Sequence, residues 1–461
     1  MLFNSYDFIF LFLISVLFGW FVLKGVFKQS SSVFIYYLIL VSIIFYGQWS
    51  LEHLVILLVS ITINYIYAIN KKINNLYFII ILNLLPLIYY KYSGFLSMSE
   101  DSLVLPLAIS FFTFQQIAFQ VDLYKGKIKL EGFDKYLFFV LFFPQLVAGP
   151  IVHYNDLVGQ FKQHAQKGIR LQPYPLLCIQ QGILLFSIGL FKKVVLADSL
   201  APYANSAFGD VAGLSFYDAW IGLFAYSFEI YFDFSGYADM AIGLALLFGF
   251  RLPINFLSPY KSRNIVEFWR NWHITLSTFL KEHLYIPLGG NRFGMGRSVV
   301  NLLVTMTIGG IWHGAGWTFV LWGFMHGVFL GVVHLFSGDQ NRQKGVRLKT
   351  YPFLSVSTVF TFMIVTLLWV LFRAESFSDA LIYYDALFHI SKFDFSLQDN
   401  YLIIVSFIVV WVLPNSMEFS KYMSNNYRPS SLHALFSAVL FFISLKVMAN
   451  TPALTFVYFN F

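Results

Sequence analysis

The chain has 461 residues, of which 58% are hydrophobic and only 11% are charged, with a formal net charge of +7 and a mean hydropathy of +0.69. A soluble protein of this length cannot carry so much apolar surface without exposing it to water, so the composition excludes a soluble globular protein and predicts an integral membrane protein. Cys178 is the only cysteine, which excludes an internal disulfide and a thiolate metal cluster, and we expect no bound metal.

Apolar windows of about 18 to 22 residues, the length that crosses a hydrocarbon core of roughly 30 Å, recur along the whole chain. They predict an all-α polytopic membrane protein with about ten to twelve transmembrane helices. The first window lacks a basic n-region and a small-residue cleavage site, so we expect a retained helix rather than a signal peptide. The clearest windows are residues 7–24, 33–48, 52–69, 75–90, 179–197, 213–232, 299–311, 317–336, 353–372, 401–413 and 432–448.

Two further segments, 103–120 and 136–150, are interrupted by residues such as Pro106, Pro144 and Gly149. Irregular backbone is tolerated at membrane depth only where protein or a water-filled cavity surrounds it. These segments therefore predict broken or re-entrant helices that pack inside the protein.

Lysines gather in loops that alternate with acidic ones. Lys24 and Lys28 follow the first window, and Lys71 and Lys72 follow the third. Because basic loops stay on the cytoplasmic side, we predict that the N-terminus lies outside. This topology and contact with anionic lipid of the bilayer account for the positive charge, so we expect no nucleic-acid partner. The same rule places three further basic stretches inside, 125–135, 162–170 and 251–297.

Three carboxylates lie close together in the sequence FEIYFDFSGYADMAIG: Glu229, Asp233 and Asp239. A carboxylate is expensive at membrane depth, which favours a functional group that faces a cavity or a partner. Glu229 and Asp233 are four residues apart and share one helix face. We predict that Asp233 binds a substrate. The equally weighted alternative is that these side chains only bond to neighbouring helices and fix their packing.

The stretch FWRNWHITLS contains Arg270, Asn271 and His273, and FLKEHLYIPLGGNRFGMGRS follows it directly. Aromatic residues mixed with Arg and Lys are typical of a helix lying in the cytoplasmic membrane interface. The glycines around Arg292 predict a loop whose backbone N–H groups and guanidinium groups hold a phosphorylated ligand. An ordinary basic connector is an equally good interpretation of this loop.

Two histidines, His313 and His326, lie in the strongly apolar sequence IGGIWHGAGWTFVLWGFMHG. Desolvation disfavours the charged imidazolium, so a histidine in such a sequence tends to be neutral and able to accept a proton, as a general base must. The small residues around His313 allow either close helix approach or room for a substrate. A hydrogen-bonded packing role is the alternative for each histidine.

Several of these motifs, in this order, resemble the core of the membrane-bound O-acyltransferase (MBOAT) family: FWRNWHITLS, YIPLGGNR, GGIWHGAGW and WGFMHG. LPLAISFFTFQQIAFQVDLYKG and FFPQLVAGPIVHYNDL resemble the bacterial branch of the family that acts in alginate and peptidoglycan O-acetylation. The resemblance implies one acyltransferase domain, 1–461, in which a ring of helices surrounds a central funnel. N-terminal helices would occupy 1–100, the family core 101–335, and C-terminal helices with an aromatic tail 336–461.

The resemblance also implies an enzyme that moves an acetyl group from cytoplasmic acetyl-CoA across the membrane, for O-acetylation of a secreted or cell-wall polysaccharide. No bound cofactor is expected, since acetyl-CoA is a substrate. The essential histidine of the family falls on His313, the expected general base, and a second family position falls on His273. His273, Asn271 or the Trp312 N–H is expected to stabilise the oxyanion. The other expected donor-binding residues are Arg270, Arg292 and His326.

The sequence ends in TFVYFNF, which resembles the aromatic terminus of extracytoplasmic polymer acylation systems. This resemblance makes Tyr458 a candidate acyl relay, whereas an interfacial aromatic belt is the alternative. The resemblance to the acyltransferase family also implies that the protein lies in the bacterial inner membrane. It further implies a periplasmic or membrane-anchored partner with an SGNH-like acetyltransferase domain.

Two other functions are compatible with the buried polar residues. A proton-coupled transporter or flippase of a polysaccharide secretion system would use Asp233, His273 and His313 as a path across the membrane. A non-catalytic assembly subunit would tolerate replacement of His313. Dependence of acyl transfer on His313 separates the enzyme from both alternatives.

Overall fold

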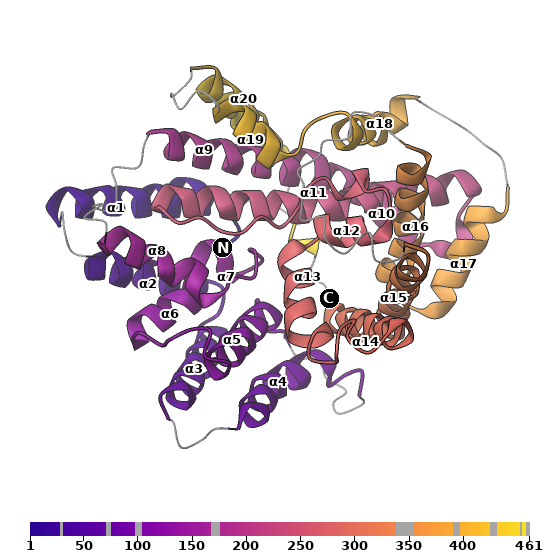
Figure 1. Ribbon diagram of the computed structural model, residues 1–461. Coiled ribbons are helices and arrows are strands. Elements are labelled where there is room, and N and C mark those ends of the chain that lie inside the picture. Colours follow the sequence, from indigo (N-terminus) through magenta and orange to yellow (C-terminus); the bar gives the residue numbers. More distant parts are fainter. Residues whose placement is uncertain are drawn as a thin grey trace. The chain divides into compact units, whose positions relative to one another are not determined.

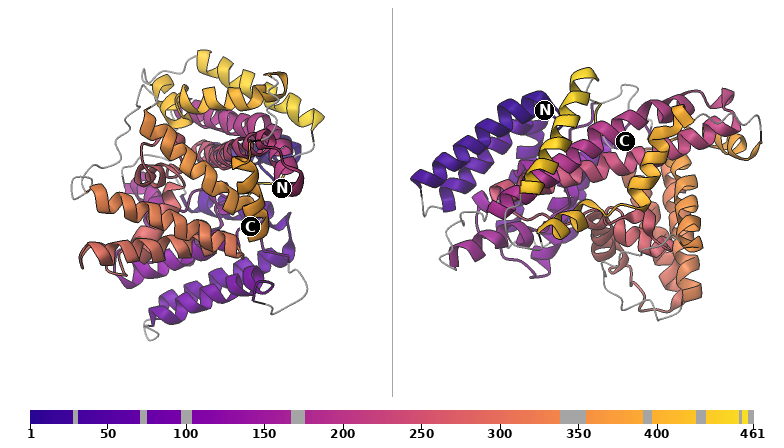
Figure 2. Two further views of the ribbon diagram at one scale, coloured as in Figure 1. Left: turned by 90° about the vertical axis from the view of Figure 1, so that its right-hand side faces the viewer. Right: turned by 90° about the horizontal axis from the view of Figure 1, so that it is seen from above.

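The computed structural model describes residues 1–27, 31–70, 75–96, 104–166, 176–337, 355–390, 397–424, 431–451 and 454–457. Every regular element in these ranges is a helix, so the predicted all-α class is confirmed (Figures 1 and 2). The chain forms two compact units. The first comprises Met1–Phe191, Tyr237–Ile254 and Ser420–Thr455, and the second comprises Lys192–Gly236, Asn255–Phe419 and Phe456–Phe461.

The first unit contains most of the N-terminal half of the chain and one helix from near its end. Its elements are η1 (Asp7–Leu13), α1 (Ile14–Val26), α2 (Ser31–Gly47), α3 (Leu51–Ile69), α4 (Leu76–Tyr92), α5 (Ile109–Tyr124), α6 (Phe133–Leu141), α7 (Phe143–Leu146), α8 (Tyr154–Gln166), α9 (Leu176–Phe191) and α20 (Ser431–Asn450). Two helices have residues in both units, α11 (Phe216–Phe248) and α19 (Ser416–Ser424).

The second unit contains the motifs FWRNWHITLS, YIPLGGNR, GGIWHGAGW and WGFMHG, and its helices can be followed in Figure 1. Its elements are η2 (Lys192–Ala197), α10 (Asp198–Gly209), η3 (Val211–Gly213), η4 (Pro259–Lys261), α12 (Ile265–Asn271), α13 (Ile274–Leu280), η5 (Lys281–Tyr285), α14 (Met295–His313), α15 (Trp317–Ser337), α16 (Val356–Arg373), α17 (Phe377–Phe388) and α18 (Leu397–Trp411).

Each apolar window predicted from the sequence falls on a helix. Among the described residues, the helices long and apolar enough to cross a membrane are Asp7–Val26, Leu51–Ile69, Phe216–Phe248, Trp317–Phe336, Val356–Arg373 and Ser431–Asn450. Ser32–Gly47, Leu76–Tyr92 and Asn400–Trp411 are apolar but shorter. The total number of crossings and the ring around a funnel stay predictions.

The helix α11 is longer than the window 213–232 that predicted it. It continues to Phe248 and has 33 residues, and its most apolar window is wholly buried within the protein. Asp233 and Asp239 therefore lie inside the helix and do not end it, because protein rather than lipid surrounds them.

The interruptions predicted in 103–120 and 136–150 are present. The helix α5 begins only at Ile109, after Ala108 in the left-handed region (φ 61°). In the second segment α6 ends at Leu141 and α7 has four residues. Since a helix rises about 1.5 Å per residue, neither α6 nor α7 is long enough to span a bilayer.

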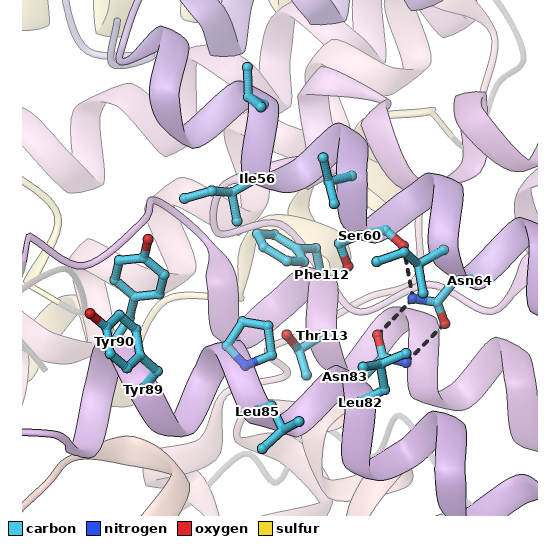
Figure 3. A pocket seen from close by; sticks show the side chains of 14 residues that line it. Ile56, Ser60, Asn64, Leu82, Asn83, Leu85, Tyr89, Tyr90, Phe112 and Thr113 are labelled. Carbon is cyan, nitrogen blue, oxygen red and sulfur yellow. Dashed lines mark hydrogen bonds between the residues drawn. The ribbon is translucent and has the colours of Figure 1, made fainter.

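A network of amides lies inside the first unit, where α3, α4 and α5 meet, and Figure 3 shows its members Asn64 and Asn83. Asn64 and Asn83 exchange two hydrogen bonds, 2.8 and 2.9 Å long. Gln120 Nε2 donates to the carbonyl and the side-chain oxygen of Asn64, at 2.9 and 3.0 Å. The network borders a pocket of about 550 Å³ whose other walls are mainly apolar, with Pro86 and Thr113 among them (Figure 3).

In the second unit, glycines bring α14 and α15 into backbone contact. A Cβ atom at Gly310 would lie 2.3 Å from the carbonyl oxygen of Phe319, and one at Gly323 would lie 2.3 Å from that of Met306. Of the two roles that the sequence left open for the small residues, close helix approach is therefore what Gly310 serves. The contact fixes His313, the last residue of α14, against the first turns of α15.

Candidate active site

All the described residues that the sequence singled out for the site belong to the second unit. His273 lies between α12 and α13, Trp312 and His313 end α14, and His326 lies on α15. Asp233 is on α11. Tyr458 lies outside the described residues, so its predicted role is untested.

His273 interrupts what the sequence predicted to be one interfacial helix. It adopts φ 44° and ψ 54°, in the left-handed region, and its side chain is fully buried. Its ring lies 4.7 Å from the ring of Phe234 and 6.3 Å from that of Trp312, centroid to centroid. A non-glycine residue held in this backbone region is strained, and such strain is concentrated at functional sites.

Asn255 holds His273 in a defined orientation. Its Oδ1 accepts hydrogen bonds from the backbone N–H and the hydroxyl of Thr275, at 3.2 and 3.0 Å, and lies 3.2 Å from Nδ1 of His273. An amide oxygen only accepts, so Nδ1 of a neutral His273 carries the proton and Nε2 is left with a bare lone pair. Nε2 has no hydrogen-bond partner among the described residues.

His273 is neutral in the folded protein. Burial lowers the pKa of His273 from 6.5 to about 3, because the apolar surroundings disfavour the charged imidazolium. The bare Nε2 is therefore able to accept a proton or a hydrogen bond at neutral pH. It has no proton to donate to an oxyanion, so His273 does not fit the donor role that the sequence left open for it.

His313 lies in an aromatic enclosure and is only 4% exposed. Its ring centroid is 4.9 Å from Trp312, 5.1 Å from Trp322 and 5.2 Å from Phe372. Trp312 contacts both His313 and His273, so the structure brings together the two histidines that the family resemblance singles out.

His326 has the opposite tautomer. The indole N–H of Trp269 donates to Nδ1 of His326 at 3.2 Å, so in the neutral ring the proton resides on Nε2. His326 is fully buried, and Nε2 has no partner in the described part of the chain. Trp322 links the two histidines of this region, with its ring 4.6 Å from His326 and 5.1 Å from His313.

Asp233 is fully buried and has protein partners at both oxygens. Oδ1 lies 2.7 Å from Nζ of Lys193, which also lies 2.7 Å from a carboxylate oxygen of Asp198. Oδ2 accepts a 2.7 Å hydrogen bond from the backbone N–H of Val457. Asp233 thus has the bonds to neighbouring segments that the packing alternative requires, and its binding of a substrate stays a prediction.

The remaining predicted residues lie outside this aromatic cluster. Arg270 and Arg292 are exposed, and the amide of Asn271 donates to Ser262 Oγ at 3.3 Å. Near Arg292, Gly289 and Gly290 have positive φ values of 110° and 57°. The loop thus has the backbone that its glycines predict, while binding of a phosphorylated ligand stays a prediction.

Three residues of the site escaped prediction from the sequence. Asn255 is an isolated amide in a loop, with no spacing that marks it. Lys193 stood inside a predicted apolar span, where its charge was given no role. Trp322 was one of many aromatic residues in an apolar helix. Of these three residues, only Lys193 has a feature in the sequence that could have marked it as part of the site. A charged side chain inside an apolar segment indicates a buried partner or a functional role.

Comparison with known proteins gives one family match and several relatives. The family model of the membrane-bound O-acyltransferases matches residues 131–372, a region that contains His273, His313 and His326. A peptidoglycan O-acetyltransferase of Helicobacter pylori is 41% identical over 424 residues, which cover 83% of this chain and 78% of the relative. A probable alginate O-acetylase of Azotobacter vinelandii is 36% identical, with 87% and 80% covered. A teichoic acid D-alanyltransferase of Streptococcus thermophilus is 29% identical, with 53% and 60% covered.

Proposed function

Because the chain belongs to the membrane-bound O-acyltransferase family and is thus an acyltransferase, we propose that it O-acetylates a secreted or cell-wall polysaccharide with acetyl-CoA as the cytoplasmic donor. The relatives named as O-acetyltransferases or O-acetylases are 35% to 41% identical to it, whereas those named D-alanyltransferases are 26% and 29% identical. This difference favours acetyl over D-alanyl as the transferred group.

The observation that carries the proposal is the enclosure of His313 by aromatic rings next to His273. A buried, neutral imidazole is able to take the proton of an attacking hydroxyl. The hydroxyl oxygen then forms a bond to the thioester carbonyl carbon, the carbon–sulfur bond breaks, and the CoA thiolate leaves with the proton from the imidazolium. General base catalysis of this kind contributes about 10²- to 10⁴-fold to the rate.

The tautomers assign different tasks to the neighbouring groups. The bare Nε2 of His273 accepts a hydrogen bond or a proton beside Trp312, so it supports proton transfer. Of the oxyanion donors considered from the sequence, Asn271 and the indole N–H of Trp312 remain. Trp312 is the better placed of the two, because its ring contacts both His273 and His313.

Tyr458 is proposed to receive the acetyl group and to pass it outward. An SGNH-like partner at the outer face of the bacterial inner membrane would place it on the sugar, and the N-terminus would lie on that same face. Acetyl-CoA, the polysaccharide and this partner are the interactions that the proposal requires.

The proposal is tested with purified protein in lipid vesicles and acetyl-CoA labelled in the acetyl group. CoA release and protein-bound label are compared for the native protein, His313→Ala and Tyr458→Phe. We expect His313→Ala to lose both signals and Tyr458→Phe to lose the bound label. His334→Ala, a change at a histidine of the neighbouring helix α15 that lies outside the aromatic cluster, is the matched control and should behave as the native protein.

Equal signals from the native protein and His313→Ala would contradict the catalytic assignment. If no signal appears even with partner and polysaccharide present, while a proton or lipid-linked sugar crosses the vesicle membrane, the chain is a transporter instead.

A further inference from the structure

We propose that Asp233 and Lys193 are positioning residues that hold the chain's own segment 456–457 next to Phe234, which packs against His273. One carboxylate oxygen of Asp233 accepts the backbone N–H of Val457, and the other lies 2.7 Å from Nζ of Lys193. The placement of the segment stands on contacts alone. Its catalytic consequence rests on the proposed function, since Val457 directly precedes the predicted relay, Tyr458.

The bond to Val457 is unusual because a side chain in the middle of a long buried helix binds the main chain of a residue 224 positions away. A backbone N–H offers the same donor whatever the side chain, so Asp233 fixes the path of the segment rather than its sequence. The 2.7 Å length is that of a charge-assisted hydrogen bond, which is stronger than a neutral one.

Lys193 supplies the opposite charge that a buried carboxylate requires. Asp233 and Lys193 are almost wholly buried, with side chains 1% and 3% exposed, and a lone charge in such a place would be strongly destabilising. Lys193 also pairs with Asp198, so it lies between two carboxylates and is fixed in place. Lys193 thus holds one oxygen of Asp233 and leaves the other for Val457.

A second contact holds the same segment through its side chain. Phe456 is 1% exposed, and its ring lies 5.3 Å from that of Phe234. Phe234 follows Asp233 directly on α11 and packs edge-on against His273 at 4.7 Å. Two adjacent residues of α11 therefore hold the segment: Asp233 binds the backbone of Val457, and Phe234 contacts the ring of Phe456. Phe234 also contacts His273.

The placement is tested by the reactivity of a thiol in the segment. The native thiol is removed by Cys178→Ser, and Val457→Cys then introduces a probe that keeps the backbone N–H. We expect N-ethylmaleimide to label this probe at least about tenfold faster when Asp233→Asn or Lys193→Met is added, because a hydrogen bond to a charged group is lost. Leu454→Cys, at a position that is 39% exposed, is the control and should be labelled at one rate in all backgrounds.

Unchanged labelling of the Val457→Cys probe in both backgrounds would overturn the proposal. Faster labelling of the Leu454→Cys control by the same factor would also overturn it, because the variants would then have loosened the fold in general.

The catalytic consequence has its own test, in which no buried charge is changed. Val457→Pro removes the N–H that Asp233 binds and adds the rigidity of a proline ring, whereas Leu454→Pro adds the same rigidity three positions earlier and leaves that N–H in place. We expect Val457→Pro to reduce kcat for acetyl transfer at least about tenfold with the KM for acetyl-CoA and the melting temperature unchanged, and Leu454→Pro to have little effect. Normal kcat in Val457→Pro would contradict a positioning role. A native protein without any acyl transfer would defeat the proposed function, but the labelling result would stand.

Discussion

Two polar clusters, one in each unit of the chain, bury their side chains in different ways. In the first unit, Asn64, Asn83 and Gln120 bond to one another and to nearby carbonyl groups, so that every side-chain N–H of the three amides donates within the protein. In the second unit, His273 and His326 each have one nitrogen bonded and the other without a partner among the described residues. A buried polar group without a partner costs stability, so the second arrangement calls for another explanation than packing.

The difference between the two clusters gives a way to distinguish buried polar residues that stabilise the fold from those that take part in a reaction. A closed network stabilises the helices that contribute to it, and nothing is left over for a ligand. An open one keeps a lone pair or a proton available, as a reaction with a thioester and a hydroxyl requires.

The largest expected effect lies in the second unit, with His273→Asn. Asparagine tolerates the left-handed backbone, so the variant should fold, while the bare Nε2 is lost. We expect acetyl transfer to fall about 10²-fold, as measured by CoA release from acetyl-CoA, with the melting temperature changed little at neutral pH. Full activity of this variant would show that His273 serves packing rather than catalysis. The unpaired nitrogen of His273 would then no longer distinguish a reactive cluster from a structural one.

The next effect lies in the first unit, with Asn83→Leu. This change leaves one N–H of Asn64 without its acceptor, so we expect the free energy of unfolding to fall by about 1–3 kcal/mol. Acetyl transfer per folded molecule should be unchanged.

The double variant Asn64→Leu/Asn83→Leu sharpens this result. It removes both members of the pair, so its loss should be smaller than the sum of the two single losses. A drop in activity per folded molecule, rather than in stability, would show that the amide network also takes part in function.

The smallest expected effect is a dependence of stability on pH that His273 causes. Unfolded His273 binds a proton below pH 6.5, whereas the folded residue stays neutral until about pH 3. Stability is therefore complete above pH 6.5 and falls as the pH decreases, by about 2 kcal/mol at about pH 5. Denaturant unfolding of the native protein and His273→Asn at both pH values should show this loss in the native protein alone. Parallel losses would mean that His273 is charged in the folded state.

The positions of the helices could be predicted because a helix that faces lipid must be apolar and long enough to cross the bilayer. The same criterion gave too short a window for α11, because it assumes that lipid surrounds Asp233, whereas protein does. The break between α12 and α13 depends on the left-handed φ of His273, which no apolar pattern encodes. Asn255 acts through three hydrogen bonds to residues 18 and 20 positions away, a relation that only the fold creates.

The sequence identified which residues are candidates for the site, but it did not give their hydrogen-bond partners or the positions of their protons. His273 and His313 were chosen together, and the structure brings both to Trp312. The proton positions on His273 and His326 follow from Asn255 and Trp269, neither of which the sequence connects to them. For Asp233 the sequence left substrate binding and packing equally open, and its carboxylate has the partners Lys193 and Val457.

The buried pair of Lys193 and Asp233 also bears on how the protein is made. Of the helices able to cross a membrane, α11 has the lowest mean hydropathy, and a carboxylate at its centre costs about 2.5–3.5 kcal/mol on the scale of translocon insertion. Lys193 is synthesised before Asp233, so a partner that neutralises the carboxylate is available when α11 leaves the ribosome. The insertion of α11 should therefore depend on the preceding segment, and a Lys193→Met chain should accumulate with α11 outside the bilayer more often than the native chain does.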